Sequence, residues 1–126
     1  MKNIVISLIL FIALIFGVFI SLNYLSTMCN DLVKKSDTIE EQIAKENWQE
    51  AYNSSMKLTD DWKEHCDTIS FFVHHQEIDN IDNELWKLSQ YTKCRNKDES
   101  LASIHVVKFY INHIKNLENV TIQNIL

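Results

Sequence analysis

The sequence predicts an all-α protein in which an N-terminal transmembrane helix is followed by an antiparallel helical bundle of about four helices. Three observations lead to this prediction. An uncharged apolar run opens the chain, amphipathic segments with helical spacing follow it, and the 126 residues include one Gly and no Pro. Tight hairpins, phosphate-binding loops and dinucleotide-binding fingerprints need glycine. Its scarcity therefore excludes those turns and sites.

The first element is the apolar run. No charged side chain lies between Asn3 and Asn30, and residues 4–22 are apolar apart from two serines and the glycine. A bilayer core of about 30 Å requires roughly 20 apolar residues as helix, whereas the apolar part of a cleaved signal peptide is about 7–15 residues long. We therefore expect residues 1–29 to form an uncleaved transmembrane anchor that contacts the lipid bilayer through residues 4–28.

The alternatives to an anchor are a cleaved signal and a lipoprotein. No small-residue cleavage motif closes the run, and Met28 stands where a lipoprotein would carry a small residue before Cys29. Lys2 precedes the run, while Lys34 and Lys35 follow it, so the positive-inside rule gives no clear orientation. A short N-terminal flank favours a cytoplasmic N-terminus. We expect a single-pass protein of the cell membrane with residues 30–126 extracytoplasmic.

Two helices are expected directly after the anchor. Leu32, Ile39 and Ile43 recur at helical spacing, so the anchor should continue into a helix that ends near Lys45. Asn47 is a candidate N-cap for the next helix, because its short side chain can accept hydrogen bonds from the N–H groups of the first turn. The apolar stripe of that second helix is Trp48, Ala51, Tyr52, Leu58 and Trp62, with Ser55 and Cys66 on the same side.

Two further helices complete the prediction. Asp67 and Thr68 are the capping candidates for a third helix over residues 68–92, and Asp98 with Glu99 suits the positive start of a fourth. The third stripe is Phe71, His74, Ile78, Ile81, Leu85 and Leu88, and the fourth is Leu101, Ile104, Val107, Ile111, Ile114 and Leu117. Four amphipathic helices with short polar connections favour an antiparallel bundle over residues 30–126.

Charge and cysteine content exclude some partners. Residues 30–126 carry all 17 acidic residues and all but one of the 12 basic residues. A surface with this negative balance repels phosphate backbones, so we expect no nucleic-acid partner. Cys29, Cys66 and Cys94 form no CxxC pair and give no zinc or redox signature. An up-down bundle returns Cys66 close to Cys29, so these two can form a disulfide; free thiols are the alternative.

The polar residues give no catalytic motif. His65 and Cys66 are adjacent, but neighbours on a helix point about 100° apart, which works against a Cys–His hydrogen bond. His74 and Glu77 form one reversed pair, whereas di-iron bundles use Glu-x-x-His on two helices. We expect that the protein is not an enzyme and that it has no catalytic residue, no cofactor and no metal site. The residues expected to bind a partner, or to fix the corner between helices, are His75, Glu77 and Trp86.

An ordered set of short motifs extends over nearly the whole chain. It comprises Asn47-Trp48 with Ala51, Trp62, His75-Gln76-Glu77-Ile78 with Asp79, His113-Ile114 and the ending Asn124-Ile125-Leu126. Together with the anchor, this set resembles a bacterial family of membrane-anchored small proteins catalogued as domain of unknown function 4363. The resemblance implies a bacterial cell-membrane protein. It implies no activity and no functional residue.

Two functions fit these expectations. The first is a non-catalytic interaction or accessory module of a bacterial cell-membrane complex, whose partner is another integral membrane protein or a second copy of the chain. An exposed apolar patch around Trp86 or the tail Val120–Leu126 would support it. The alternative is an extracytoplasmic bundle that senses a small ligand or a metal. It requires a cavity of about 300 Å³ or more with a histidine or tryptophan in its wall.

Overall fold

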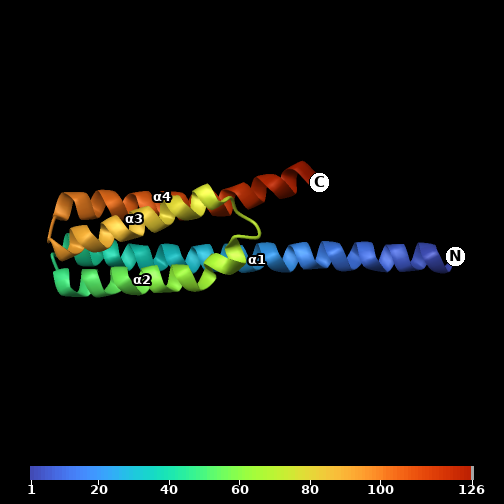
Figure 1. Ribbon diagram of the computed structural model, residues 1–126, viewed down its shortest axis with the longest axis horizontal. Coiled ribbons are helices and arrows are strands. Elements are labelled where there is room, and N and C mark those ends of the chain that lie inside the picture. The colour runs from blue at the N-terminus through green and yellow to red at the C-terminus, as the bar shows by residue number, and fades with distance from the viewer. Residues whose placement is uncertain (126) are drawn as a thin grey trace.

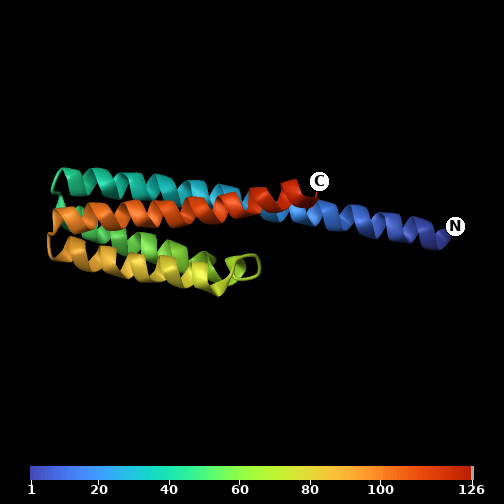
Figure 2. The same cartoon turned by 90° about the horizontal axis from the view of Figure 1, so that it is seen from above.

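The computed structural model describes the backbone of residues 1–125 and the side chains of residues 1–117. The described residues form four helices and no strand: α1 (Lys2–Ala44), α2 (Trp48–Ile69), α3 (His75–Lys93) and α4 (Lys97–Ile125). Figures 1 and 2 show the second half of α1 packed with α2, α3 and α4 in an antiparallel bundle. Each helix packs against its two neighbours around the ring. The predicted fold class is confirmed.

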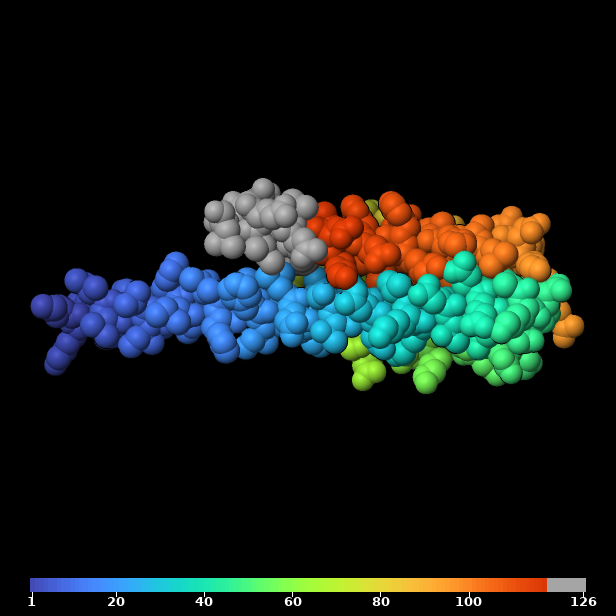
Figure 3. All heavy atoms as spheres, turned by 180° about the vertical axis from the view of Figure 1, so that it is seen from behind, coloured from blue at the N-terminus to red at the C-terminus, as the bar shows by residue number. Residues whose placement is uncertain are grey.

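Helix α1 has two halves with different surroundings. It is a single helix of 43 residues whose apolar stretch is long enough to cross a membrane, and none of that stretch is buried in the chain. Figure 3 shows this N-terminal part projecting beyond the bundle. The first buried residue is Leu25. The helix runs without a break past the expected boundary at residues 29 and 30, and Met28 and Cys29 already belong to the core.

The bundle core consists of the apolar stripes of the four helices. Buried stripe residues that were predicted are Leu32, Ile39 and Ile43 on α1, Ala51, Leu58 and Trp62 on α2, Ile78, Ile81, Leu85 and Leu88 on α3, and Ile104, Val107, Ile111 and Ile114 on α4. Small hydroxyl side chains fill other core positions. Ser36 donates to the Leu32 carbonyl at 2.8 Å, and Ser55 to the Ala51 carbonyl at 2.7 Å. Each hydroxyl is satisfied within its own helix, so it can be buried between helices.

The α1–α2 and α3–α4 turns reverse the chain without glycine. Glu46 and Arg95 both adopt a left-handed conformation with φ of 58° just after a helix end. In the first turn the Glu46 N–H donates to the Ile43 carbonyl and the Asn47 N–H donates to the Gln42 carbonyl. The second turn repeats this pattern. It is the Schellman arrangement, in which glycine usually holds the left-handed position.

The predicted N-cap of the second helix has the expected position but lacks the expected side-chain hydrogen bond. Asn47 is the N-cap of α2 by position, but its side chain makes no capping hydrogen bond. Asn96 holds the equivalent place before α4, and its side-chain oxygen accepts the Glu99 N–H at 3.1 Å. The side-chain capping hydrogen bond expected at Asn47 is therefore found at Asn96, in the other turn. In both turns the asparagine backbone N–H also closes the preceding helix.

The predicted start of the third helix is also wrong. Asp67 and Thr68 lie inside α2, which ends at Ile69, and α3 begins after an N-cap at His74. The reason is that Ile69, which is fully buried, continues the core stripe of α2. Phe71 and His74, placed in the third stripe, lie instead in the connection and are exposed.

Candidate functional site

Two contacts that involve a histidine link helices at the end of the bundle from which α1 projects, here called the projecting end. The Tyr24 hydroxyl and His65 Nδ1 are 2.7 Å apart and join α1 to α2. Their rings meet edge to face, with centroids 5.9 Å apart. Glu77 Oε1 and His113 Nε2 are 3.6 Å apart and join α3 to α4, as an ion pair only when His113 is protonated. A histidine thus joins α1 to α2 and another joins α3 to α4 at this end.

The three residues expected to bind a partner or fix the corner lie in different environments. Glu77 is in the first turn of α3, where the positive end of the helix dipole suits a carboxylate, and its partner His113 is on α4. His75 is the first residue of α3 and is exposed. Trp86 lies on α3 with 65% of its surface exposed. The structure therefore brings Glu77 into a contact between helices, while His75 and Trp86 face solvent.

The other two tryptophans belong to the packing of the bundle. Trp62 is 1% exposed, and its indole Nε1–H donates to Asp82 Oδ1 at 2.7 Å, from α2 to α3. Trp48 is partly buried and packs against the core. A buried indole N–H that reaches a carboxylate is fully satisfied. The exposure of Trp86 therefore sets it apart as a surface residue.

The three cysteines are thiols in the structure: Cys29 is buried, Cys66 is half-buried and Cys94 is exposed. Burial, together with the nearby charges of Asp82 and Asp67, raises the pKa of the Cys66 thiol to about 11. The thiolate is the nucleophilic form, so Cys66 is a weak nucleophile near neutral pH. Of the two alternatives that the sequence left open for Cys29 and Cys66, the structure has the thiols and not the disulfide.

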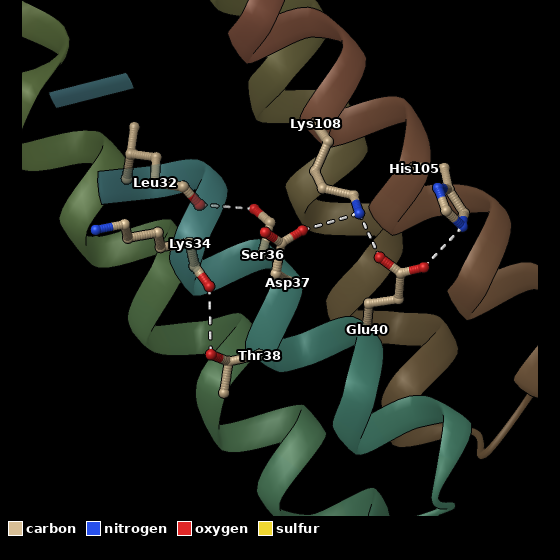
Figure 4. A network of polar contacts seen from close by, with 8 residues as sticks. All are labelled: Leu32, Lys34, Ser36, Asp37, Thr38, Glu40, His105 and Lys108. Atoms are coloured by element: carbon tan, nitrogen blue, oxygen red, sulfur yellow. Dashed lines mark hydrogen bonds and ion pairs between the residues drawn. The ribbon is translucent and has the colours of Figure 1, made fainter. Parts of the chain in front are cut away.

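A network of charged side chains joins α1 to α4 (Figure 4). Lys108 Nζ donates to Asp37 Oδ1 at 3.0 Å and to Glu40 Oε2, while His105 Nε2 lies 3.1 Å from Glu40 Oε1. Partial burial opposes the charge of Lys108, but the hydrogen bonds that the lysine donates to Glu40 and Asp37 outweigh it and raise the pKa of the lysine. These contacts hold α4 in register against α1. They form a structural clamp, here called the α1–α4 clamp.

A shallow groove lies on the opposite side of α1. It has a volume of about 170 Å³ and is lined by Lys35, Thr38, Ser54, Lys57, Leu58 and Asp61. Lys35 Nζ crosses it to reach Asp61 Oδ2 at 2.8 Å. This lining is charged and includes neither histidine nor tryptophan. Within the part of the chain that the structure describes, no group of three or more His, Cys, Asp or Glu side chains is placed to hold a metal ion.

Sequence reasoning missed several exposed aromatic side chains. Phe71 is 85% exposed and Phe72 46% exposed in the α2–α3 connection, and Phe109 is 66% exposed on α4, stacked on His113. The signal for Phe71 was the continuing α2 stripe, in which Ile69 follows Trp62 at core spacing. The tail Val120–Leu126, which was expected to contribute to a patch, lies outside the residues whose side chains are described.

Comparison with known proteins gives a family. Searches of curated proteins and of solved structures found no match. The model of one protein family, described as a domain of unknown function (DUF4363), matches residues 19–125. The match starts inside the apolar run of α1 and includes the bundle with both turns and the α2–α3 connection. The chain therefore belongs to the DUF4363 family.

Proposed function

We propose that the chain is a non-catalytic accessory module, anchored in a bacterial cell membrane by the first half of α1, that binds another integral membrane protein through its bundle. The observation that supports this best is the continuity of α1. Its apolar half is not buried by any of the residues that the structure describes, and the same helix then forms one side of the bundle core. A bundle built on the anchor helix itself is held at the membrane surface without a flexible linker.

The bundle surface supplies the second support. Trp86 exposes 65% of a large aromatic side chain on the outside of α3. Exposed tryptophans are costly in water and are enriched among the residues that dominate protein interfaces. The polar clusters, in contrast, are used in contacts between helices. We infer that the module acts by binding and that Trp86 is a central contact.

The direct test is purification from the native membrane in mild detergent. We expect a larger membrane protein to remain bound to the full-length chain at a fixed ratio. The variant Trp86→Ala should lose it, while Asn83→Ala, an exposed residue one turn away on α3, should retain it. A chain that emerges alone, or only with copies of itself, would contradict the proposal.

The orientation is tested separately with a membrane-impermeant maleimide on intact cells. Cys94 is exposed at the turn between α3 and α4, far from the projecting end. If residues 30–126 are extracytoplasmic, this thiol reacts without breaking the cells, and Cys94→Ser abolishes the labelling. Labelling that requires lysis would place the bundle in the cytoplasm.

A further inference from the structure

The α2–α3 connection presents two adjacent phenylalanines to the outside. Phe71 is 85% exposed and Phe72 46%, whereas the next residue, Val73, is 8% exposed and belongs to the core. The N–H groups of Phe72 and Val73 both donate to the Ile69 carbonyl, at 2.8 and 3.0 Å. The connection is therefore a hydrogen-bonded turn held by Val73, and this geometry directs both phenylalanine rings away from the bundle.

This turn lies beside the point where the apolar run of α1 ends. The Tyr24–His65 contact sets α2 against α1 just after Leu22, the last residue of the run. From His65, α2 continues to Ile69, which moves it about 6 Å further towards the N-terminus of α1 at 1.5 Å per residue. Figures 1 and 2 both show the connection at the projecting end.

The chemistry of the turn also differs from the rest of the bundle. Residues 68–76 contain no Asp, Glu, Lys or Arg and form the longest such run within residues 30–126. Charged residues resume on both sides, at Asp67 and Glu77. An exposed aromatic pair without nearby charge suits the boundary between lipid headgroups and acyl chains, where apolar side chains are buried and the backbone stays hydrated.

We propose that the Phe71–Phe72 tip inserts into the interface of the same bilayer that α1 crosses. The bundle would then contact the membrane at two points, the anchor and the tip. A single transmembrane helix leaves the tilt of its attached domain free, whereas interfacial side chains at a second point set it. The tip thereby fixes which face of the bundle is turned away from the membrane. This inference rests on the proposed anchoring by α1.

The test uses the full-length chain in vesicles of phosphatidylcholine and phosphatidylglycerol, with and without acyl chains brominated near the headgroup. Phe71→Trp and Phe72→Trp place an indole at the tip. Phe109→Trp is the matched control, because Phe109 is also an exposed phenylalanine. Its neighbour Lys108 contacts Asp37, a residue of α1 that lies far beyond the apolar run. Subtracting the wild-type signal removes the fluorescence of the three native tryptophans.

We expect brominated lipid to quench the added fluorescence of both tip variants, and their emission to shift to the blue relative to the control. The control should show neither change. If all variants float with the vesicles and the tip is not quenched, or the control is quenched equally, the inference is overturned while the anchor stands. If the wild-type chain does not float with vesicles, the anchoring proposal fails and this inference fails with it.

Discussion

The two halves of α1 are one continuous helix in two different environments. In the first half, large apolar side chains are exposed on all sides, with Leu14 at 66% and Phe16 at 67%. In the second half only one stripe is apolar, and its members Leu25, Leu32 and Ile39 are at most 2% exposed. A helix that is apolar all round needs an apolar environment on every side, while an amphipathic helix needs one on a single face. Among the described residues, the bundle supplies an apolar surface for one face of the second half and none that buries the first half.

The difference teaches that the absence of charged residues does not by itself mark the boundary between the two halves. Leu25, Met28 and Cys29 continue the uncharged run of the first half, yet they pack in the core. The transition falls around Tyr24, whose hydroxyl contacts His65 on α2. An amphipathic aromatic residue at this place is typical of a membrane interface.

The largest effect is expected from removing an apolar side chain in the bundle half. Leu32→Ala should lower the free energy of unfolding by about 2–5 kcal/mol, because it removes buried contacts and leaves a cavity. Leu14→Ala removes the same atoms from an exposed position and should leave the thermal unfolding of the bundle unchanged. Unfolding in detergent followed by circular dichroism measures both. Equal effects would show that the first half also contributes to the bundle core.

A charge introduced into the first half of α1 should impair membrane insertion, whereas Leu32→Ala impairs the stability of the bundle. Ile12→Lys places a charge near the middle of the apolar run and should weaken membrane insertion by about 2.5–3.5 kcal/mol. Ala44→Lys adds the same charge to the last, exposed residue of α1 and should leave insertion unchanged. Retention in the membrane fraction after an alkaline wash compares the two. Retention of Ile12→Lys at the wild-type level would contradict a lipid environment for this half.

A smaller effect is expected from the α1–α4 clamp. Lys108→Met should cost about 1 kcal/mol, because the pair with Asp37 and Glu40 is only partly shielded from water. The folded-state pKa of Lys108 is raised. Its contribution is therefore fully present below the unfolded lysine pKa of about 10.4 and is lost as the pH rises through the higher folded pKa. The stability difference between wild type and variant should shrink at strongly alkaline pH.

The smallest effect is expected in the turns, and it should be stabilising. Glu46→Gly relieves a left-handed conformation that costs a non-glycine residue about 1–2 kcal/mol. Glycine loses more backbone entropy on folding, so a net gain of up to about 1 kcal/mol remains. Chemical denaturation gives the value, and Lys45→Gly, one position earlier in a right-handed conformation, is the control expected to destabilise.

The sequence alone predicted the elements that depend on periodicity. The stripe positions from Ile78 to Leu88 and from Ile104 to Ile114 were predicted correctly, because a long amphipathic pattern leaves one face to bury. The α2–α3 corner was wrong, because Asp67 is a good local cap but the packing of Ile69 decides where α2 ends. The preference of a residue for a cap position does not reveal which nearby apolar residue is buried in the core.

Contacts between distant segments could not be predicted from one sequence. Lys108 meets Asp37 only because of the relative register of α4 and α1, which emerges from the packed bundle. The left-handed Glu46 and Arg95 carry no sequence signal, since glycine is the residue that marks such turns. For the candidate site, Trp86 and Glu77 were singled out in advance, while the exposed Phe71 became apparent only with the corner in place.

The most direct test of the account compares the full-length chain with a chain that begins at Asn23. The account predicts that the full-length protein floats with lipid vesicles and requires detergent for extraction. The shortened chain should be recovered in the aqueous fraction and should unfold cooperatively, as a helical bundle, on heating. A shortened chain that is unfolded, or a full-length chain that is soluble without detergent, would contradict the division of α1 into an anchor half and a bundle half.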